Sequence, residues 1–176
     1  MKINSNITVR EVKNDDELKE FVMFPHKLYK DSMYWVAPII NEELEVLNKK
    51  TNPVFKNADA HYFLAFTNGE IVGRIAALIN WVEVNDLKKK KVRFGWFDFI
   101  DNKEVSKSLL NVVIKIGNDN NLEFIEGPVG FSNMDKAGML IKGFDKKNTM
   151  ITLYNHSYYQ DHMIAHGYKK LAEWVE

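Results

Sequence analysis

Hydrophobic and polar positions along the chain change their spacing several times, and this predicts alternating strands and helices. Residues 7–12 alternate and predict a strand, and apolar residues then recur at helical spacing over 18–29. The polar residues 14–16 can cap this helix. Pro25 is expected to break or kink it, because proline lacks the amide proton that a helix needs. A second helix is predicted over 42–49.

A β-hairpin is the clearest single element. An Asn-Gly pair at 68–69 separates the apolar runs 61–67 and 71–79, and such a pair between two apolar runs is the strongest short-range hairpin signal. The following link, 80–91, ends in four lysines, 88–91. No aromatic residues are interleaved with them, so we expect a solvated hairpin tip rather than a phosphate-binding patch.

The strand predicted over 92–100 has an irregular hydrophobic pattern. Its apolar residues up to Trp96 lie on one face by parity, whereas Phe97 and Phe99 lie on the other. Gly95 lies beside this change, and a strand glycine at a change of phase favours a β-bulge. A strand buried on both faces would give the same pattern, so both interpretations stay open.

The second half of the chain begins with the best amphipathic helix, capped by Asp101 or Asn102 and ending near Gly117. Shorter elements follow it. They are a strand over 122–125, an extended segment over 150–154, a helix over 158–166 and an extended segment over 168–175.

Composition narrows the classes of function. Lys plus Arg and Asp plus Glu number 24 each, so no long-range field attracts nucleic acid or an anionic membrane. The absence of cysteine excludes a disulfide framework, a thiolate nucleophile and a cysteine zinc site. No apolar leader and no run of about 18 apolar residues is present. We therefore expect a cytoplasmic protein that binds a small molecule, not nucleic acid or membrane.

The order of elements and the closing segment HMIAHGYKKLAEWVE (162–176) resemble the GNAT (N-acetyltransferase) superfamily, in which a last helix closes on Gly-aromatic before basic residues. The segments FPHKLYKDSMYW (24–35), GPVGFSNMDKAGMLIKGFD (127–145) and YNHSYY (154–159) look like a group of uncharacterised bacterial GNAT-like proteins. The resemblance covers essentially the whole chain. It implies one α+β domain over 1–176, with a mixed, mostly antiparallel sheet flanked by helices. Members of the group often continue further, so a homodimer or a further domain after residue 176 stays open as a partner.

The resemblance implies acetyl-CoA or another acyl-CoA as cofactor, held by the backbone amides of an Arg/Gln-x-x-Gly-x-Gly/Ala loop that opens the helix after the third strand. The corresponding junction, FDFIDNKEVSKSLL, has no glycine between 96 and 116, and acidic residues lie where a diphosphate would bind. The loop is therefore degenerate, and the superfamily's frequent proton-donating Tyr is replaced by Met163. Candidate cofactor contacts are the main-chain groups near the helix start: Phe99, Ile100, Asn102, Lys103, Glu104 and Val105.

Three residues are candidates for proton transfer in acyl transfer to an amine. Asp98 lies between two phenylalanines and could act as a general base; alternatively it turns to solvent or to a partner on a neighbouring strand. Glu126 ends a strand beside the expected cleft, where structural hydrogen bonding is the alternative. Tyr154, or its neighbours Tyr158 and Tyr159, could replace the missing proton donor, or could serve packing and turn formation. The competing hypothesis for the whole chain is a catalytically inactive binding or interaction module.

Three histidines, His156, His162 and His166, form the remaining pattern with chemical potential. Residues 162 and 166 share a helix face, as metal ligands can. No carboxylate spacing completes a familiar site, so we expect no metal and solvated histidines on the helix.

Overall fold

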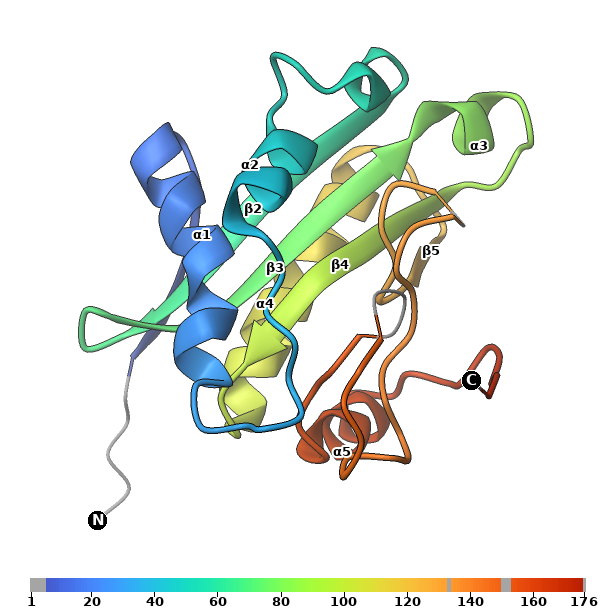
Figure 1. The fold of residues 1–176 in the computed structure, drawn as a ribbon. Helices are drawn as coiled ribbons and strands as arrows, with labels where there is room; N and C mark the ends of the chain where they lie inside the picture. The colour runs from blue at the N-terminus through green and yellow to red at the C-terminus, as the bar shows by residue number, and fades with distance from the viewer. Residues whose placement is uncertain (1–5, 133, 150–152, 176) are drawn as a thin grey trace.

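The computed structural model describes residues 6–132, 134–149 and 153–175, and a five-stranded sheet in the order β1-β2-β3-β4-β5 forms its centre (Figure 1). The strands are β1 (Ile7–Glu11), β2 (Ala58–Thr67), β3 (Glu70–Asn80), β4 (Lys91–Phe99) and β5 (Phe124–Glu126). The helices are α1 (Asp15–Leu28), α2 (Ile40–Leu47), the 3-10 helix η1 (Pro53–Lys56), α3 (Trp81–Asn85), α4 (Lys103–Asp119) and α5 (Tyr158–Ala165). Neighbouring strands are antiparallel except β4 and β5, which are parallel. The predicted α+β fold with a mixed, mostly antiparallel sheet is therefore confirmed.

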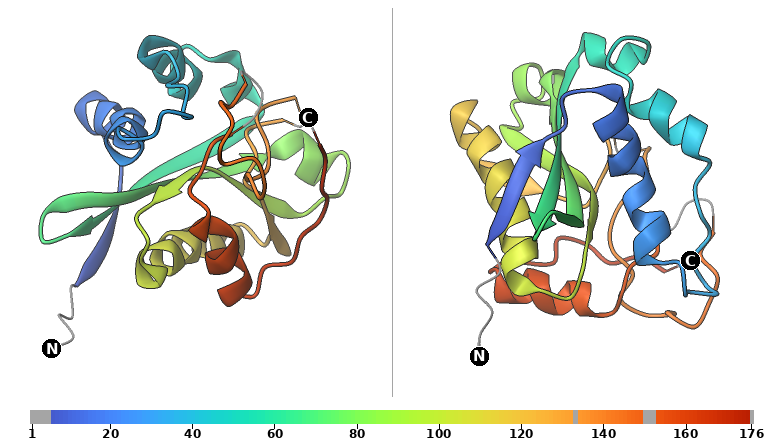
Figure 2. Two further views of the ribbon diagram at one scale, coloured as in Figure 1. Left: turned by 60° about the horizontal axis from the view of Figure 1, so that its bottom comes forward. Right: turned by 90° about the vertical axis from the view of Figure 1, so that its left-hand side faces the viewer.

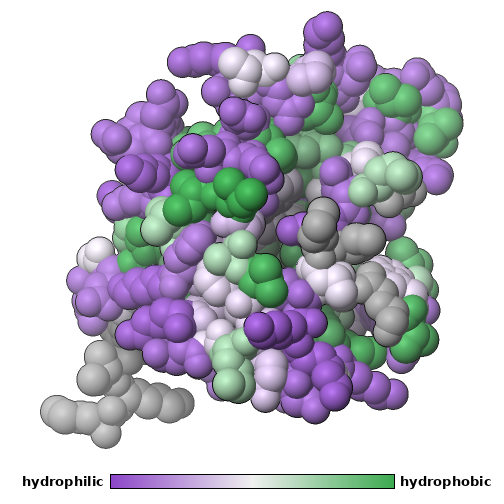
Figure 3. Space-filling view, in the orientation of Figure 1, coloured by the Kyte–Doolittle hydropathy of each residue, from purple (hydrophilic) through white to green (hydrophobic). Residues whose placement is uncertain are grey.

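Helices cover both faces of the sheet. Figure 2 shows α1 and α2 on one face, and α4 and α5 on the other. The strand side chains divide accordingly: Phe63 and Ile75 belong to the buried cluster with α4, whereas Leu64 and Ala76 belong to the cluster with α1 and α2. This alternation is the period of two that a strand buried on both faces requires. The face seen in Figure 3 is mainly hydrophilic and is broken by hydrophobic patches.

The β2–β3 hairpin has the predicted Asn-Gly turn. Asn68 and Gly69 both have positive φ angles, 52° and 84°, as a type I′ turn requires. The hairpin prediction is confirmed, and β2 and β3 are three and two residues longer than the apolar runs indicated.

A β-bulge in β4 explains the change of hydrophobic phase. Arg74 pairs with Asp98 and Ala76 pairs with Gly95, so β4 has one residue more than β3 between these pairs. Trp96 has a φ of 45° there, and a Cβ on Gly95 would lie 2.7 Å from the carbonyl oxygen of Val129. The bulge keeps the phenylalanines on both sides of it in the α4 cluster and turns the side chain at position 98 toward α1. Since β4 is buried on both faces as well, both sequence interpretations hold.

Helix α1 continues for three residues beyond Pro25 instead of breaking there. Because proline has no N–H, the carbonyl of Phe21 lacks its usual helical donor. That carbonyl instead accepts a hydrogen bond of 2.9 Å from Nη1 of Arg74 on β3. The proline thus provides a buried acceptor for a charged side chain of the sheet.

Two segments differ from the sequence prediction. The link before β4 contains α3, whose first turn is capped by the side chain of Asn80, and the last lysine of the run, Lys91, is buried. Residues 168–175 are described throughout but form no strand. Trp174 instead packs against Gly138, since a Cβ there would lie 2.8 Å from its ring. A strand needs a neighbour to satisfy its main chain, and among the described residues no strand pairs with this segment. Most of the extended segment expected over 150–154 lies outside the described residues.

Within the described residues, every helix is too short or too polar to cross a membrane.

Candidate functional site

A buried ion pair lies where β3 and β4 pass the carboxyl end of α1. Asp98, 8% exposed, receives hydrogen bonds from Arg74 Nε (2.8 Å) and Nη2 (2.7 Å) on the same carboxylate oxygen. Its other oxygen receives a bond of 2.7 Å from the hydroxyl of Tyr29. Asp98 therefore contacts a partner on a neighbouring strand, the second of the two interpretations that its sequence position allowed.

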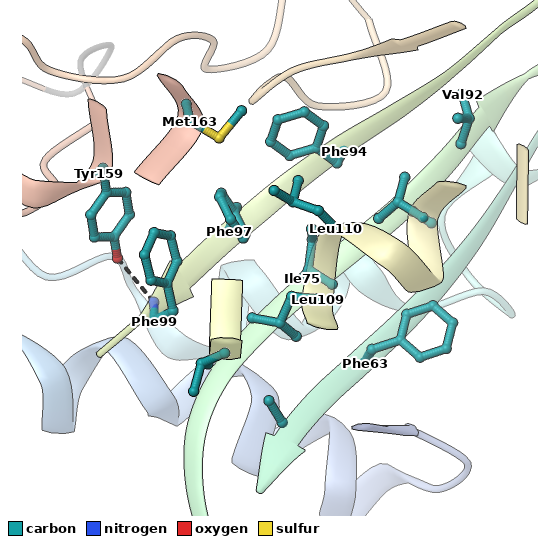
Figure 4. Close-up of a cluster of buried hydrophobic side chains, with 14 of the residues drawn as sticks. Phe63, Ile75, Val92, Phe94, Phe97, Phe99, Leu109, Leu110, Tyr159 and Met163 are labelled. Atoms are coloured by element: carbon teal, nitrogen blue, oxygen red, sulfur yellow. Dashed lines mark hydrogen bonds between the residues drawn. The ribbon is translucent and has the colours of Figure 1, made fainter. Parts of the chain in front are cut away.

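A chain of hydrogen bonds runs from this carboxylate to the main chain of β4. The hydroxyl of Tyr29 lies 2.8 Å from that of Tyr159, which accepts a bond of 3.0 Å from the N–H of Phe99 (Figure 4). The hydroxyl of Tyr29 donates to Asp98, so its oxygen is left to accept from Tyr159, whose hydroxyl also lies 3.5 Å from the same carboxylate oxygen. Burial, followed by the charge of Asp98, raises the pKa of both phenols well above 10. Both phenols therefore stay protonated, and each keeps a proton to donate within these hydrogen bonds.

The expected cofactor contacts lie together where β4 leads into α4, but their main-chain groups have partners within the chain. The carbonyl of Phe99 accepts from the hydroxyl of Tyr158 at 2.6 Å, and the N–H of Ile100 donates to Val72. Asn102 is the N-cap, and its side chain accepts from the N–H of Glu104 at 2.9 Å. Helix α4 then begins with Lys103, and Val105 is fully buried. The carbonyl of Phe99 and the N–H groups of Ile100 and Glu104 are thus used within the chain.

Side chains of α5 and of its C-cap residue His166 contact the amino-terminal half of α4. The hydroxyl of Ser106 lies 2.8 Å from Nδ1 of His162 and 2.8 Å from Nε2 of His166. His162 is 1% exposed and its Nε2 lies 2.9 Å from Asp101, so the expectation of solvated histidines is wrong for it. Ser106 is completely buried, which leaves it no access to a substrate. In the described part of the chain, no three His, Asp or Glu side chains are grouped so as to hold a metal ion.

A cleft of about 550 Å³ opens beside the ion pair. Its walls come from the end of α1, the loop after it, and two segments near the carboxyl end of the chain. The lining residues are Leu28, Tyr29, Asp31, Ser32, Met33, Tyr34, Phe144, Tyr154 and His156. Tyr154 meets Tyr29 edge to face, with 5.4 Å between ring centroids. Tyr29 belongs both to this cleft and to the hydrogen-bond chain, so it joins the two.

Glu126 lies away from the ion pair of Asp98. It is opposite Arg93 in the parallel pairing of β5 with the first half of β4. Its carboxylate forms an ion pair with the buried Lys91, which also lies 3.4 Å from Glu83. Glu83 in turn contacts Arg93 at 2.7 Å. This cluster joins α3 to the two strands and provides the structural hydrogen bonding that was the alternative for Glu126.

Two residues of this region, Tyr29 and Arg74, were not among the sequence candidates, whereas Tyr159 had been named beside Tyr154 as a possible proton donor and His156 only within the histidine pattern. The sequence offers a sign of the buried position of Arg74, because this residue is the lone charge within the apolar run IVGRIAALI and shares the parity of Ala76. Tyr29 had been assigned to an apolar helix face and His156 to a metal pattern. Their proximity depends on the loops after α1 and before α5, which periodicity does not describe.

Comparisons with known proteins agree with this fold. No family model matches the sequence. The chain is 31% identical over 172 residues to Protein YghO of Escherichia coli K12, and 28% identical over 174 residues to the Bacterial ceramide synthase of Caulobacter vibrioides. These alignments cover 96% and 97% of the chain but 44% of each relative, so the chain spans less than half their length.

Solved acetyltransferases have the same architecture. An aminoglycoside N-acetyltransferase in complex with CoA superposes with a TM-score of 0.60 at 13% identity, covering 100% of this chain and 96% of that one. A Clostridium acetobutylicum protein described as a predicted acetyltransferase, with acetyl-CoA, gives 0.58 at 13% identity and covers 97% and 95%. At such identities the similarity establishes architecture rather than activity. The chain therefore has the fold of the GNAT acetyltransferases.

Proposed function

We propose that this chain is the GNAT-like part of an N-acyltransferase that moves an acyl group from an acyl-CoA to a long-chain amine. The observation that carries the proposal is the junction made by Tyr29, which lines the cleft and donates to Asp98 on β4. The GNAT resemblance puts the acyl donor along β4, and the cleft offers an acceptor a place beside it. The relative described as a ceramide synthase supports this choice of acceptor, since a ceramide is the N-acyl derivative of a long-chain amino alcohol.

The residues of this chain have distinct roles in the proposal. Asp98 is held by Arg74 and binds the hydroxyl of Tyr29, a residue of the cleft wall, so it is a positioning residue rather than a base that touches the amine. Tyr154, on the cleft wall, is the candidate donor of a proton to the leaving thiolate. Glu126 has no role, because its ion pair with Lys91 lies along the other half of β4.

A thiol-release assay tests the proposal directly. The chain has no cysteine, so a thiol-reactive dye reports only free CoA. The full chain is incubated with acetyl-CoA or palmitoyl-CoA and with sphinganine, and mass spectrometry identifies the amide. We expect CoA release that requires the amine, with an equal amount of N-acyl product. Release without amine, or no release at millimolar substrates, would refute acyl transfer by this chain.

The satisfied main-chain groups of Phe99, Ile100 and Glu104 favour a second candidate, a non-catalytic module that binds a small amphiphile in the cleft. Calorimetric titration separates the two. If the chain is an acyltransferase, we expect it to bind palmitoyl-CoA with micromolar affinity. A separate titration with CoA shows whether the nucleotide part of the cofactor binds by itself. Binding of the long-chain amine without any heat from either CoA compound would favour the module.

A further inference from the structure

The chemistry of the cleft suits one kind of ligand. Most of its wall is apolar or aromatic, from Leu28, Met33 and Phe144 to the tyrosine rings, and its carboxylate is that of Asp31. Aromatic faces and a carboxylate both favour a cation, and the apolar wall favours an aliphatic chain. These properties together fit a molecule with an ammonium group at one end and a hydrocarbon chain.

His156 is held in this wall by its neighbours. Its ring stacks on Tyr158 with centroids 5.2 Å apart and planes inclined by 22°, and it lies 4.9 Å from the ring of Tyr29. Burial lowers the pKa of this ring, and the nearby main chain of Leu28, which favours the protonated form, raises it by less. A neutral imidazole keeps a lone pair on one of its two ring nitrogens.

We propose that this cleft binds a long-chain primary amine and that the free ring nitrogen of His156 takes the proton from its amino group. This inference rests on the proposed function. The amine nitrogen attacks the thioester carbonyl, the C–N bond forms and the C–S bond breaks. The amine's proton passes to His156, and CoA leaves as thiolate and takes a proton from Tyr154 or solvent. An amine that arrives as ammonium first gives its extra proton to water.

The electrostatic surroundings keep His156 neutral before the reaction. Burial, the larger effect, lowers its pKa below 6.5, while the main chain of Leu28 and the charges of Asp98 and Asp101 raise it. Tyr29 and Tyr158 face the ring as neutral phenols, because burial raises the pKa of both. Tyr34, Tyr154 and the carboxylate of Asp31 are the other titratable groups that line the cleft. An unprotonated imidazole beside an amine is the arrangement that general-base catalysis needs.

The first arm of the test is binding, which needs no acyl donor. The chain contains five histidines, and the Hε1 proton signals of their rings are followed by NMR during titration with dodecylamine below its micelle concentration. His156→Gln assigns the signal. We expect that signal to shift saturably while the signal of His61, on β2 and bonded to Glu11, stays in place. Dodecanoate has the same chain with the opposite charge and should leave both unchanged. No shift with the amine, or equal shifts with both compounds, would overturn the proposal.

Asp31→Asn provides a second binding variant, because residue 31 is exposed in the loop after α1 and its replacement leaves the core intact. Its affinity for dodecylamine should fall at least threefold, with no change in the urea midpoint. An unchanged affinity would contradict the charge complementarity on which the choice of ligand rests.

The second arm is turnover. His156→Gln should lower kcat by about 100-fold or more, leave the KM for the amine within threefold, and remove the acidic limb of the kcat/KM profile. His61→Gln is the matched control and should match the wild type. If the wild type acylates amines and His156→Gln loses less than threefold, the role of His156 is refuted while the function stands. If the wild type is inactive but the amine shifts the His156 signal, the amine site stands and acyl transfer fails.

Discussion

The buried pair of Arg74 and Asp98 allows the sharpest test of the structure, by substitution of each partner and of both. The side chains are 7% and 12% exposed, and three hydrogen bonds reach the carboxylate. Asp98→Asn keeps the shape but offers one acceptor oxygen where two were used. Arg74 then keeps the carbonyl of Phe21 as a partner and holds an uncompensated charge.

The magnitude follows from the burial of the pair. Breaking a buried ion pair by removal of one partner costs about 3–5 kcal/mol, whereas replacing both with apolar residues of similar size is often nearly neutral. Asp98→Asn and Arg74→Met should each lower the free energy of unfolding by about that amount. The double variant Arg74→Met, Asp98→Leu should recover more than half of the loss, giving a coupling energy of about 2 kcal/mol or more.

Urea unfolding monitored by circular dichroism and by the fluorescence of the four tryptophans measures these changes. Asp119→Asn is the matched control. It breaks the pair of Lys115 and Asp119 within α4, whose side chains are 71% and 52% exposed, and should change stability by under about 0.5 kcal/mol. A loss below about 1 kcal/mol in Asp98→Asn, or strictly additive losses in the double variant, would refute the coupled buried pair.

Three further predictions concern pH, the bulge and the tyrosine chain. Burial lowers the pKa of His26, His156 and His166 in the folded chain. Because the unfolded chain then binds more protons below about pH 6.5, the urea midpoint should decrease as the pH is lowered from 7.5 to 5.5. An unchanged midpoint would contradict the burial of these histidines. Gly95→Ala should destabilise by about 1–3 kcal/mol because its Cβ would lie 2.7 Å from a main-chain oxygen, whereas a loss below 0.5 kcal/mol in urea would show that the bulge can relax. Tyr159→Phe leaves the buried N–H of Phe99 without its acceptor and should cost about 1–3 kcal/mol by the same assay, with equal stability refuting the hydrogen-bond chain.

The elements that the sequence predicted well are those whose pattern is local. The Asn-Gly turn at 68–69 requires only two neighbouring residues with positive φ, and the cap at Asn102 requires one side chain and the next turn. The turn was predicted at the correct residues, and the cap is one of the two residues expected. Helix α2 was placed two residues late, because its start at Ile40 has no side-chain cap to mark it.

The candidate site was less accessible because its contacts join distant parts of the chain. Tyr29 and Asp98 are 69 residues apart, and Tyr29 and Tyr159 are 130 apart. No spacing rule connects them. His156 could be associated with other histidines by its spacing, but its actual neighbours are tyrosines from α1, α5 and its own segment.

Two irregularities of the main chain, rather than any motif, bring the charged pair together. Without the extra residue at the bulge, position 98 would face α4 and lose its place opposite Arg74, while Phe97 and Phe99 would turn out of the α4 cluster toward α1. Without Pro25, the carbonyl of Phe21 would be used within α1 and the guanidinium would lose that acceptor. Considered alone, the bulge interrupts the pairing of β4 with β3, and Pro25 removes a hydrogen bond from α1. The bulge places the carboxylate of Asp98, and Pro25 leaves a carbonyl that completes the hydrogen bonds of Arg74. Moving either feature should therefore misplace Tyr29, the residue that lines the cleft and binds Asp98.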